Sequence, residues 1–341
     1  MKAKQILWRL LRGILIATVI IGGYFAYQLY YDRKVPNFTG KMDLYVYPGM
    51  EAGHVCDSIL VSGIVKKPAS LMRVFRDVKS IQPGHYVIDA TCTSIYVTRM
   101  LHLGWQTPVN LTLSGSIRTP GILARKIGAQ MMVDSAAVAD FACCADSIGL
   151  DPALLFTRII PDTYQMTWTA PVKDIFVRLF KERDAWWTPE RVEAAKVQGL
   201  TPEEASTLAS IVDGETRYVP EQPTIAGVYL NRLREGMKLQ ADPTVAFCFD
   251  YEPRRILRWM LLVDNPYNTY MYAGLPPGPI SCPPKSCLEA AIHPESHSYI
   301  YFCADPSFNG SHRFAVTYTE HLQNARAFQK ALSERQRANA Q

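Results

Sequence analysis

Two acidic side chains, Asp213 and Glu215, lie near the end of a segment with strong helical signals. Thr201 is suited to cap the helix, Pro202 suits its first turn, and Glu204 completes a capping box. The predicted helix carries an apolar stripe on one face, and continuing the helical count along that face reaches Glu215. The stripe consists of Ala205, Leu208, Ala209 and Val212.

A carboxyl group on an apolar face keeps its proton to higher pH, because burial disfavours the charged form. Glu215 is therefore a candidate general acid, which is the group that cleavage of a glycosidic bond requires. Helical geometry turns Asp213 outward, so the two acids are not expected to act as a pair. The alternative for Glu215 is a structural role as a cap or ion-pair partner at the helix end.

Further polar and aromatic residues downstream are candidates for substrate binding. Asp242 could be a second acid, although an Asx-type turn before Pro243 is the structural alternative. Asn231 could meet a sugar or hold the loop that carries Glu215. The segment 274–279 is too rich in Pro and Gly for a helix and is expected to form a shaped loop rather than a proline-rich recognition ligand. The candidate binding set is Asn231, Gln240, Asp242, Thr244, Tyr267, Asn268, Thr269, Tyr270 and Pro276.

The elements before this region indicate a small α+β module. A strand at 44–47, two short helices and a strand at 86–88 follow a polar linker at 35–42. This order is similar to the glycan-binding LysM fold. Later patterns predict helices at 94–103, 119–132, 135–147, 151–156 and 172–186, a strand at 109–113, and an extended connector at 159–164.

The uncharged segment from Gly13 to Tyr31 is expected to form a membrane helix. Its 19 residues reach across a hydrocarbon core of about 30 Å at about 1.5 Å per residue. Four tyrosines crowd one end, and four basic residues precede the segment, which predicts a cytoplasmic N-terminus. The alternative is a cleaved signal peptide, but no A-x-A-like site follows the apolar run.

Composition narrows the functional classes. The 341 residues are 48% hydrophobic and 20% charged, as in a folded globular protein. The formal net charge of +5 arises entirely within residues 1–34, so the rest of the chain is neutral and no nucleic-acid partner is expected. The eight cysteines show no zinc spacing, and Cys282 and Cys287 are the best candidate disulfide.

Other motifs carry little weight. His293 and His297 have metal-like spacing, but Pro294 disrupts the helix that would align them, so neither a metal nor any other cofactor is expected. Trp186 and Trp187 could be a sugar platform, but packing against the core is favoured. No serine-hydrolase elbow or phosphate-binding loop is present.

Several blocks resemble the endolytic murein transglycosylase family, also called YceG-like, over residues 43–330. The longest is LASIVDGETRYVPEQPTIAGVYLNRLREGMKLQADPTV, followed by NPYNTYMYAGLPPGPI. The segments AAIHPESHSYIYFCAD and HRFAVTYTEH downstream, and QPGHYVI and PDTY upstream, are also similar. The family's catalytic glutamate lies in an E-x-E-T element, which here is Asp213-Gly214-Glu215-Thr216. The catalytic role carries over to Glu215, whereas Asp213 stands where the family usually has glutamate and Gly214 replaces a bulkier residue, so no role carries over to the first acid.

The resemblance implies non-hydrolytic cleavage of the β-1,4 bond between N-acetylmuramic acid and N-acetylglucosamine, with 1,6-anhydromuramyl ends. It also implies that the loop containing Asp242 lines the cleft, and that the protein contacts peptidoglycan synthases as well as glycan strands. Two rivals are a muramidase that uses Glu215 and Asp242 as a pair of acids, and a non-catalytic glycan-binding scaffold.

The expected fold is α+β in three parts. A cytoplasmic N-terminus and membrane helix occupy residues 1–34, a LysM-like region occupies 35–163, and a mixed α/β catalytic domain occupies 164–341. The expected location is the inner (cytoplasmic) membrane, crossed once, with the catalytic domain outside. From that location we expect the enzyme to meet newly made strands first.

Overall fold

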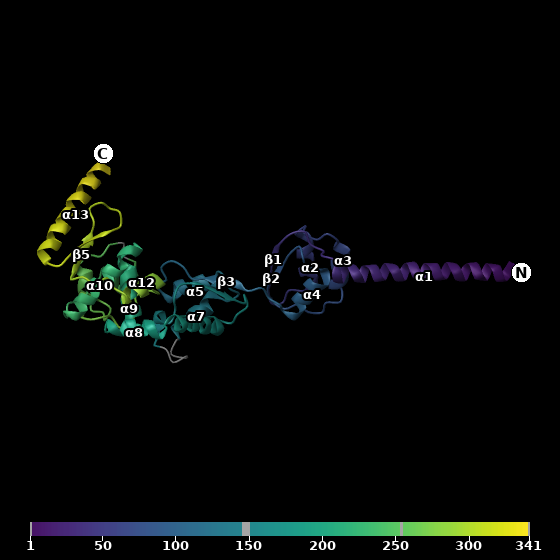
Figure 1. The fold of residues 1–341 in the computed structure, drawn as a ribbon, viewed down its shortest axis with the longest axis horizontal. Coiled ribbons are helices and arrows are strands. Elements are labelled where there is room, and N and C mark those ends of the chain that lie inside the picture. The colour runs from purple at the N-terminus through teal and green to yellow at the C-terminus, as the bar shows by residue number, and fades with distance from the viewer. Residues whose placement is uncertain (1, 145–150, 253–254, 340–341) are drawn as a thin grey trace. The chain divides into compact units, whose positions relative to one another are not determined.

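The structure is a computed structural model that describes residues 2–144, 151–252 and 255–339. The chain forms two compact units (Figure 1). Unit 1 comprises Met1–Asn110 and Gln165–Ala170, and unit 2 comprises Leu111–Tyr164 and Pro171–Gln341. The chain leaves unit 1 within strand β3 (Val109–Thr112) and returns within β4 (Thr163–Met166), and these strands form a two-stranded sheet.

Unit 1 begins with a long helix and continues as a strand, two helices and a strand, in the order that the sequence predicts. Its two strands pair antiparallel, with Leu44 opposite Tyr86. Side chains from both strands and the helices behind them form one apolar core. The elements are α1 (Lys2–Lys34), β1 (Met42–Val46), α2 (Ala52–Val61), α3 (Pro68–Phe75), β2 (Gly84–Ile88) and α4 (Ser94–Leu103).

Helix α1 is long and apolar enough to cross a membrane, and its apolar stretch is not buried inside the protein. Its last turn is held to the rest of unit 1 by polar side chains around Asp32, which is 5% exposed. The Asp32 carboxylate accepts hydrogen bonds from the Ser70 hydroxyl at 2.6 Å and from Arg73 at 2.7 and 2.8 Å. The Asn37 amide donates to Ser94 Oγ at 2.9 Å. The Asp32 bonds hold the end of α1 against α3, and the Asn37 bond holds the residues after the helix against α4, because buried polar groups need hydrogen-bond partners.

Unit 2 is mostly helical, and helix α9 is at its centre. Every residue of α9 from Ala205 to Val212 is buried, and α10 and α12 pack against it. The elements are α5 (Pro120–Gly128), α6 (Ser135–Cys143), η2 (Pro152–Thr157), α7 (Val172–Trp186), α8 (Pro189–Val197), α9 (Pro202–Glu215), η3 (Val219–Glu221), α10 (Gln222–Arg234), α11 (Asp242–Cys248), η4 (Arg258–Leu262), α12 (Lys285–Ile292), β5 (Tyr301–Ala304), β6 (His312–Ala315) and α13 (Tyr318–Asn339).

The units divide the chain differently from the boundary expected between residues 163 and 164. The structure groups 111–164 with the C-terminal part, because these residues contribute to its packing. The Phe141 ring of α6 packs against the Phe176 ring of α7 with centroids 4.8 Å apart, and η2 packs against α9. Local sequence patterns predict elements, but they do not show which core each element joins.

Two smaller expectations have clear outcomes. The expected disulfide between Cys282 and Cys287 is not formed, because all eight cysteines are free thiols. The Cys282 thiol instead donates to the Ile159 carbonyl at 3.1 Å. Trp186 and Trp187 are both buried and pack edge to face in the core of unit 2, which confirms packing rather than a surface platform. Part of the helix expected at 135–147 lies outside the described residues.

Candidate active site

Glu215 is the last residue of α9, as the helical count predicts. The capping box is present at the other end: Thr201 Oγ1 accepts from the Glu204 amide, and the Glu204 side chain accepts from the Thr201 amide. Thr216 has an extended backbone and ends the helix. The buried stripe of α9 therefore holds Glu215 at a defined place, where the free carbonyls of the helix end carry partial negative charge and disfavour a carboxylate.

The Glu215 carboxyl group lies against a buried tyrosine. Tyr229, on α10, is 1% exposed and donates its hydroxyl to Glu215 Oε1 at 2.5 Å. Burial raises the pKa of Glu215 to about 7, and the charge of Asp242 acts in the same direction. The Tyr229 hydrogen bond and the charge of Arg232 oppose this rise. The group can therefore both give and take a proton near neutral pH, as an acid/base catalyst must.

A pocket of about 310 Å³ opens over this carboxyl group. Its volume lies at the lower end of the range for ligand sites. Aromatic and polar side chains from α10, α11, β5, α13 and the connecting loops form its wall, all within unit 2. The lining residues are Glu215, Tyr229, Arg232, Gln240, Asp242, Tyr270, Tyr301, Phe302, Tyr318 and His321.

Three of the predicted binding residues line this pocket. Asp242 stands at the start of α11 and accepts a hydrogen bond from the Tyr270 hydroxyl at 2.7 Å. Gln240 has a φ of 49°, which is unusual for a residue other than glycine. Such backbone conformations are concentrated at functional sites, where the surrounding structure holds them in place. The structure thus brings Gln240, Asp242 and Tyr270 together with Glu215.

Three others lie beneath the pocket wall and hold it. Thr244 and Thr269 are buried, and their hydroxyls lie 2.8 Å apart. Thr269 Oγ1 accepts from the Ala241 amide at 3.0 Å, and Thr244 donates to the Ala241 carbonyl at 2.7 Å. Asn268 is fully buried and donates to the carbonyls of Leu261 and Val263. These residues fix the loops that carry Asp242 and Tyr270, but they do not line the pocket.

The remaining three predicted binding residues do not line the pocket. The Asn231 amide donates to the carbonyls of His297 and Tyr299 at 2.9 and 3.0 Å, so it holds the segment before β5 rather than the Glu215 loop. The Tyr267 ring packs on Phe247 with centroids 4.4 Å apart. Pro276 is buried in its loop.

The two residues that depart from the family pattern also have defined places. Asp213 is half-buried rather than turned to solvent, and burial raises its pKa; it accepts a hydrogen bond from Ser281 at 3.3 Å. The expectation that it faces outward is therefore wrong, although it does not line the pocket. A Cβ atom on Gly214 would lie 2.5 Å from Pro243 Cβ. The missing side chain lets the start of α11, and with it Asp242, pack close to the end of α9.

Six pocket residues were not singled out from the sequence. Arg232 is 8% exposed and donates to the carbonyls of Leu239 and Ile300, so one side chain joins two pocket segments. The His321 ring stacks on Tyr301, and its buried Nδ1 atom has no hydrogen-bond partner among the described residues. Burial lowers the pKa of His321, so a neutral imidazole faces the pocket. The full missed set is Tyr229, Arg232, Tyr301, Phe302, Tyr318 and His321.

A signal for these residues was present in the sequence. All six lie in the blocks that resemble the family, but the apolar and aromatic character of those blocks is equally typical of a core. By residue type alone Arg232 resembles Arg234 on the same helix, and only the structure shows that Arg232 is buried and Arg234 exposed. Among the described residues, no group of His, Cys, Asp and Glu side chains has the arrangement of a metal site.

Comparison with known proteins places this chain in a family. A protein named endolytic murein transglycosylase from Bacillus subtilis is 35% identical over 44% of this chain and 41% of its own length. One of the same name from Streptococcus pneumoniae is 23% identical over 91% of this chain and 63% of its own length. The matches thus span less than two thirds of these relatives.

A solved structure shows the same fold. The crystal structure of a YceG-like protein from Listeria monocytogenes matches 83% of this chain and 98% of its own, with a TM-score of 0.54 and 23% identity. The model of the YceG-like family matches residues 44–327, which include every residue that lines the pocket around Glu215. The chain therefore belongs to the YceG-like family.

Proposed function

We propose that the protein is a peptidoglycan lytic transglycosylase with Glu215 as its catalytic acid/base. One observation carries the proposal: the Glu215 carboxyl group, with its pKa raised to about 7 and held by Tyr229, lies in a pocket with aromatic walls. The names of the two relatives, both endolytic murein transglycosylases, support the same activity.

The proposed reaction needs one group that changes its protonation state. Protonated Glu215 gives its proton to the oxygen of the β-1,4 bond between N-acetylmuramic acid and N-acetylglucosamine, and the bond to the anomeric carbon breaks. The resulting carboxylate takes the proton of the muramyl 6-hydroxyl, whose oxygen bonds to the same carbon. The products are an N-acetylglucosamine 4-hydroxyl and a 1,6-anhydromuramyl end, and Glu215 is protonated again. A pKa near the working pH suits both steps.

The pocket wall supplies groups that suit a sugar. The rings of Tyr270, Tyr301 and Tyr318 present flat apolar faces next to hydroxyls, and aromatic side chains are useful where one face of a ligand is apolar and its edge is polar. Gln240 and His321 add hydrogen-bonding groups that can meet N-acetyl and hydroxyl groups. We therefore place the glycan chain along this wall, with its scissile oxygen at Glu215.

Mass spectrometry of the products tests the proposal. Purified glycan strands are incubated with the full chain, with Glu215→Gln, and with Glu235→Gln as a control at an exposed glutamate after α10. Wild type and the control should give anhydromuramyl ends. Glu215→Gln should lose at least about a hundredfold in rate, the lower bound for loss of a general acid. Full cleavage by Glu215→Gln would refute the assignment and favour a scaffold role or another catalytic group.

A hydrolase is the second candidate, because Asp242 lines the same pocket and glycosidases commonly use two carboxylates. The two reactions differ in their products, since a muramidase leaves reducing muramic acid instead of the anhydro form. Asp242→Asn separates them further. The transglycosylase should keep measurable cleavage with anhydro products, whereas a hydrolase that uses Asp242 to activate water should lose its activity.

We further propose that α1 anchors the protein in the cytoplasmic membrane, with its N-terminus in the cytoplasm and unit 2 outside. The basic residues before the apolar stretch and the helix length support this topology. We assign unit 1 a LysM-like glycan-binding role from its strand–helix–helix–strand order. An anchored enzyme would meet newly made strands first, next to the synthases that make them, and would act in cell wall assembly.

Labelling of single cysteines in intact cells tests the topology. An impermeant maleimide should modify a cysteine that replaces exposed Glu235 in a background without reactive native cysteines, and should not modify one that replaces Lys4. The reverse pattern would refute the proposed orientation. Labelling of both positions would refute a single membrane crossing.

A further inference from the structure

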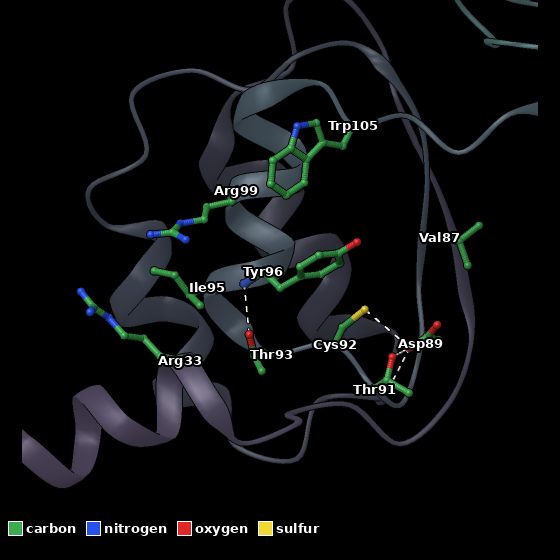
Figure 2. A pocket seen from close by; sticks show the side chains of 10 residues that line it. All are labelled: Arg33, Val87, Asp89, Thr91, Cys92, Thr93, Ile95, Tyr96, Arg99 and Trp105. Carbon is green, nitrogen blue, oxygen red and sulfur yellow. Dashed lines mark hydrogen bonds between the residues drawn. The ribbon is translucent and has the colours of Figure 1, made fainter.

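Unit 1 contains a hollow of about 520 Å³ beside the end of α1, well apart in sequence from the site around Glu215. Figure 2 shows Arg33 and Arg99 at one edge with Ile95 between them, Tyr96 and Trp105 across the middle and top, and Asp89 at the opposite edge. The hollow is lined by Arg33, Val87, Asp89, Thr91, Cys92, Thr93, Ile95, Tyr96, Arg99 and Trp105.

The charge of this hollow favours an anion. Arg33 and Arg99 are both exposed, and neither takes part in an ion pair among the described residues. The single acid, Asp89, is held by Thr91, whose amide and hydroxyl donate to its Oδ1 atom at 2.8 and 2.5 Å. The two guanidinium groups therefore keep their N–H donors available, and such groups match the oxygens of a phosphate.

The position of Arg33 sets the depth of the hollow relative to a membrane. It lies two residues beyond the uncharged stretch that ends at Tyr31, and α1 continues without a break through both residues. A side chain at this place lies at the level of lipid headgroups if α1 spans the membrane. The bonds from Ser70 and Arg73 to Asp32 hold the end of α1 against the rest of unit 1, and Arg99 of α4 lies at the same edge of the hollow as Arg33 (Figure 2).

Two aromatic side chains of the hollow, and one lysine beside α1, also suit a membrane interface. Tyr96 and Trp105 are 47% and 50% exposed, with ring centroids 6.1 Å apart. Aromatic side chains with one apolar and one polar side are enriched at headgroup depth. The Lys67 ammonium group lies 5.0 Å from the Tyr27 ring and 4.4 Å from the Tyr31 ring, which brings another cation to the last turns of the membrane helix.

We propose that this hollow binds the phosphate headgroup of an anionic membrane lipid. Arg33 and Arg99 bind the phosphate oxygens, and Ile95, Tyr96 and Trp105 contact the apolar part of the lipid next to the headgroup. A free phosphate would leave these apolar surfaces without a partner, which is why a lipid is the better occupant. This inference rests on the proposed membrane anchoring by α1, and it does not depend on catalysis at Glu215.

Native mass spectrometry of the full chain in detergent micelles tests it. Phosphatidylglycerol and, separately, phosphatidylcholine are titrated, and the fraction of protein with one bound lipid gives an apparent Kd. The variants are Arg33→Ala/Arg99→Ala and the control Lys41→Ala/Arg76→Ala, which removes two exposed basic residues of unit 1 outside the hollow. Thermal unfolding of both variants checks that they are folded.

Wild type and the control should bind phosphatidylglycerol more tightly than phosphatidylcholine. The Arg33→Ala/Arg99→Ala variant should bind phosphatidylglycerol about thirtyfold more weakly, the loss expected for two basic side chains at a lipid surface. Equal binding by this variant and wild type would overturn the proposal. Displacement of phosphatidylglycerol by millimolar inorganic phosphate, or by soluble glycan fragments, would also overturn it by assigning the hollow to a free anion or to a glycan.

The proposed membrane anchor and the proposed lipid site can be refuted separately. If α1 does not anchor the chain, wild-type protein will be released from isolated membranes by carbonate at high pH. If the chain stays in the membranes and the two variants bind lipid alike, the anchor stands and only the headgroup site is refuted.

Discussion

Replacing Glu215 with glutamine should change how the stability of the protein depends on pH, even without substrate. Glutamine has nearly the same shape, keeps an oxygen that can accept from Tyr229, and cannot ionise. Glu215 in the folded protein has a pKa of about 7, compared with its usual 4.5. The folded state therefore binds this proton more tightly than the unfolded state does.

The size of the effect follows from the two pKa values. The stabilisation that the protonated Glu215 side chain gives the folded state is fully present below about pH 4.5, decreases between pH 4.5 and 7, and changes little above that range. At about 1.4 kcal/mol per pKa unit, the wild-type protein should lose about 2.5 kcal/mol between pH 5 and 8 relative to Glu215→Gln. For a domain of this size that corresponds to a Tm difference of roughly 5 °C or more.

Differential scanning fluorimetry of the full chain in detergent, at half-unit steps from pH 5 to 8, measures this difference. The Tm of Glu215→Gln should rise relative to the Tm of wild type as the pH increases. The Tm of Glu235→Gln should follow that of wild type throughout. Parallel curves for wild type and Glu215→Gln would refute the reasoning, because they would show that Glu215 ionises as easily in the folded protein as in the unfolded chain.

Three further predictions concern the same site. The rate of glycan cleavage should fall about tenfold per pH unit above pH 7, as Glu215 loses its proton. Tyr229→Phe removes a hydrogen bond that favours the Glu215 carboxylate, so this decline in rate should move to higher pH. A pH–rate profile of both proteins measures the shift, and an unchanged profile would contradict the prediction. Gly214→Ala places a Cβ atom against Pro243 and should lower the free energy of unfolding by about 1–3 kcal/mol and reduce activity, as measured by Tm and turnover. An unchanged Tm would show that the end of α9 and the start of α11 can separate freely. Thr201→Ala removes the cap of α9 and should lower the free energy of unfolding by about 0.5–2 kcal/mol. The kcat of the folded variant should be unchanged, because Glu215 is at the other end of the helix. A lower kcat in fully folded protein would argue that the cap also positions the carboxyl group.

Local sequence patterns were sufficient to predict many of the helices and strands of this protein. The capping box and the apolar stripe located α9 and placed Glu215 on its inner face, because helix geometry is fixed by spacing that is visible in one segment. The order of strands and helices in unit 1 followed from similar local patterns. The uncharged stretch of α1 was equally clear, since length and the absence of charge can be counted directly.

The binding residues show where such reasoning stops. Thr244, Asn268 and Thr269 have the chemistry of ligand-binding side chains, but the fold turns them toward backbone groups that would otherwise be buried without partners. Tyr270, next to Thr269 in the chain, faces the pocket instead. Residue type therefore identified the correct loops, but it could not distinguish a side chain that meets ligand from one that supports the wall.

The sequence by itself determined that an acid stands at the inner end of a capped helix and that an apolar helix precedes the folded units. Only the tertiary structure decided what surrounds that acid: Tyr229 as its hydrogen-bond donor, Asp242 as its neighbouring charge, and His321 in the lining of the same pocket. Those groups are 14, 27 and 106 residues from Glu215 along the chain. A pKa depends on burial and on charges nearby in space, and a local pattern contains neither until distant segments pack together.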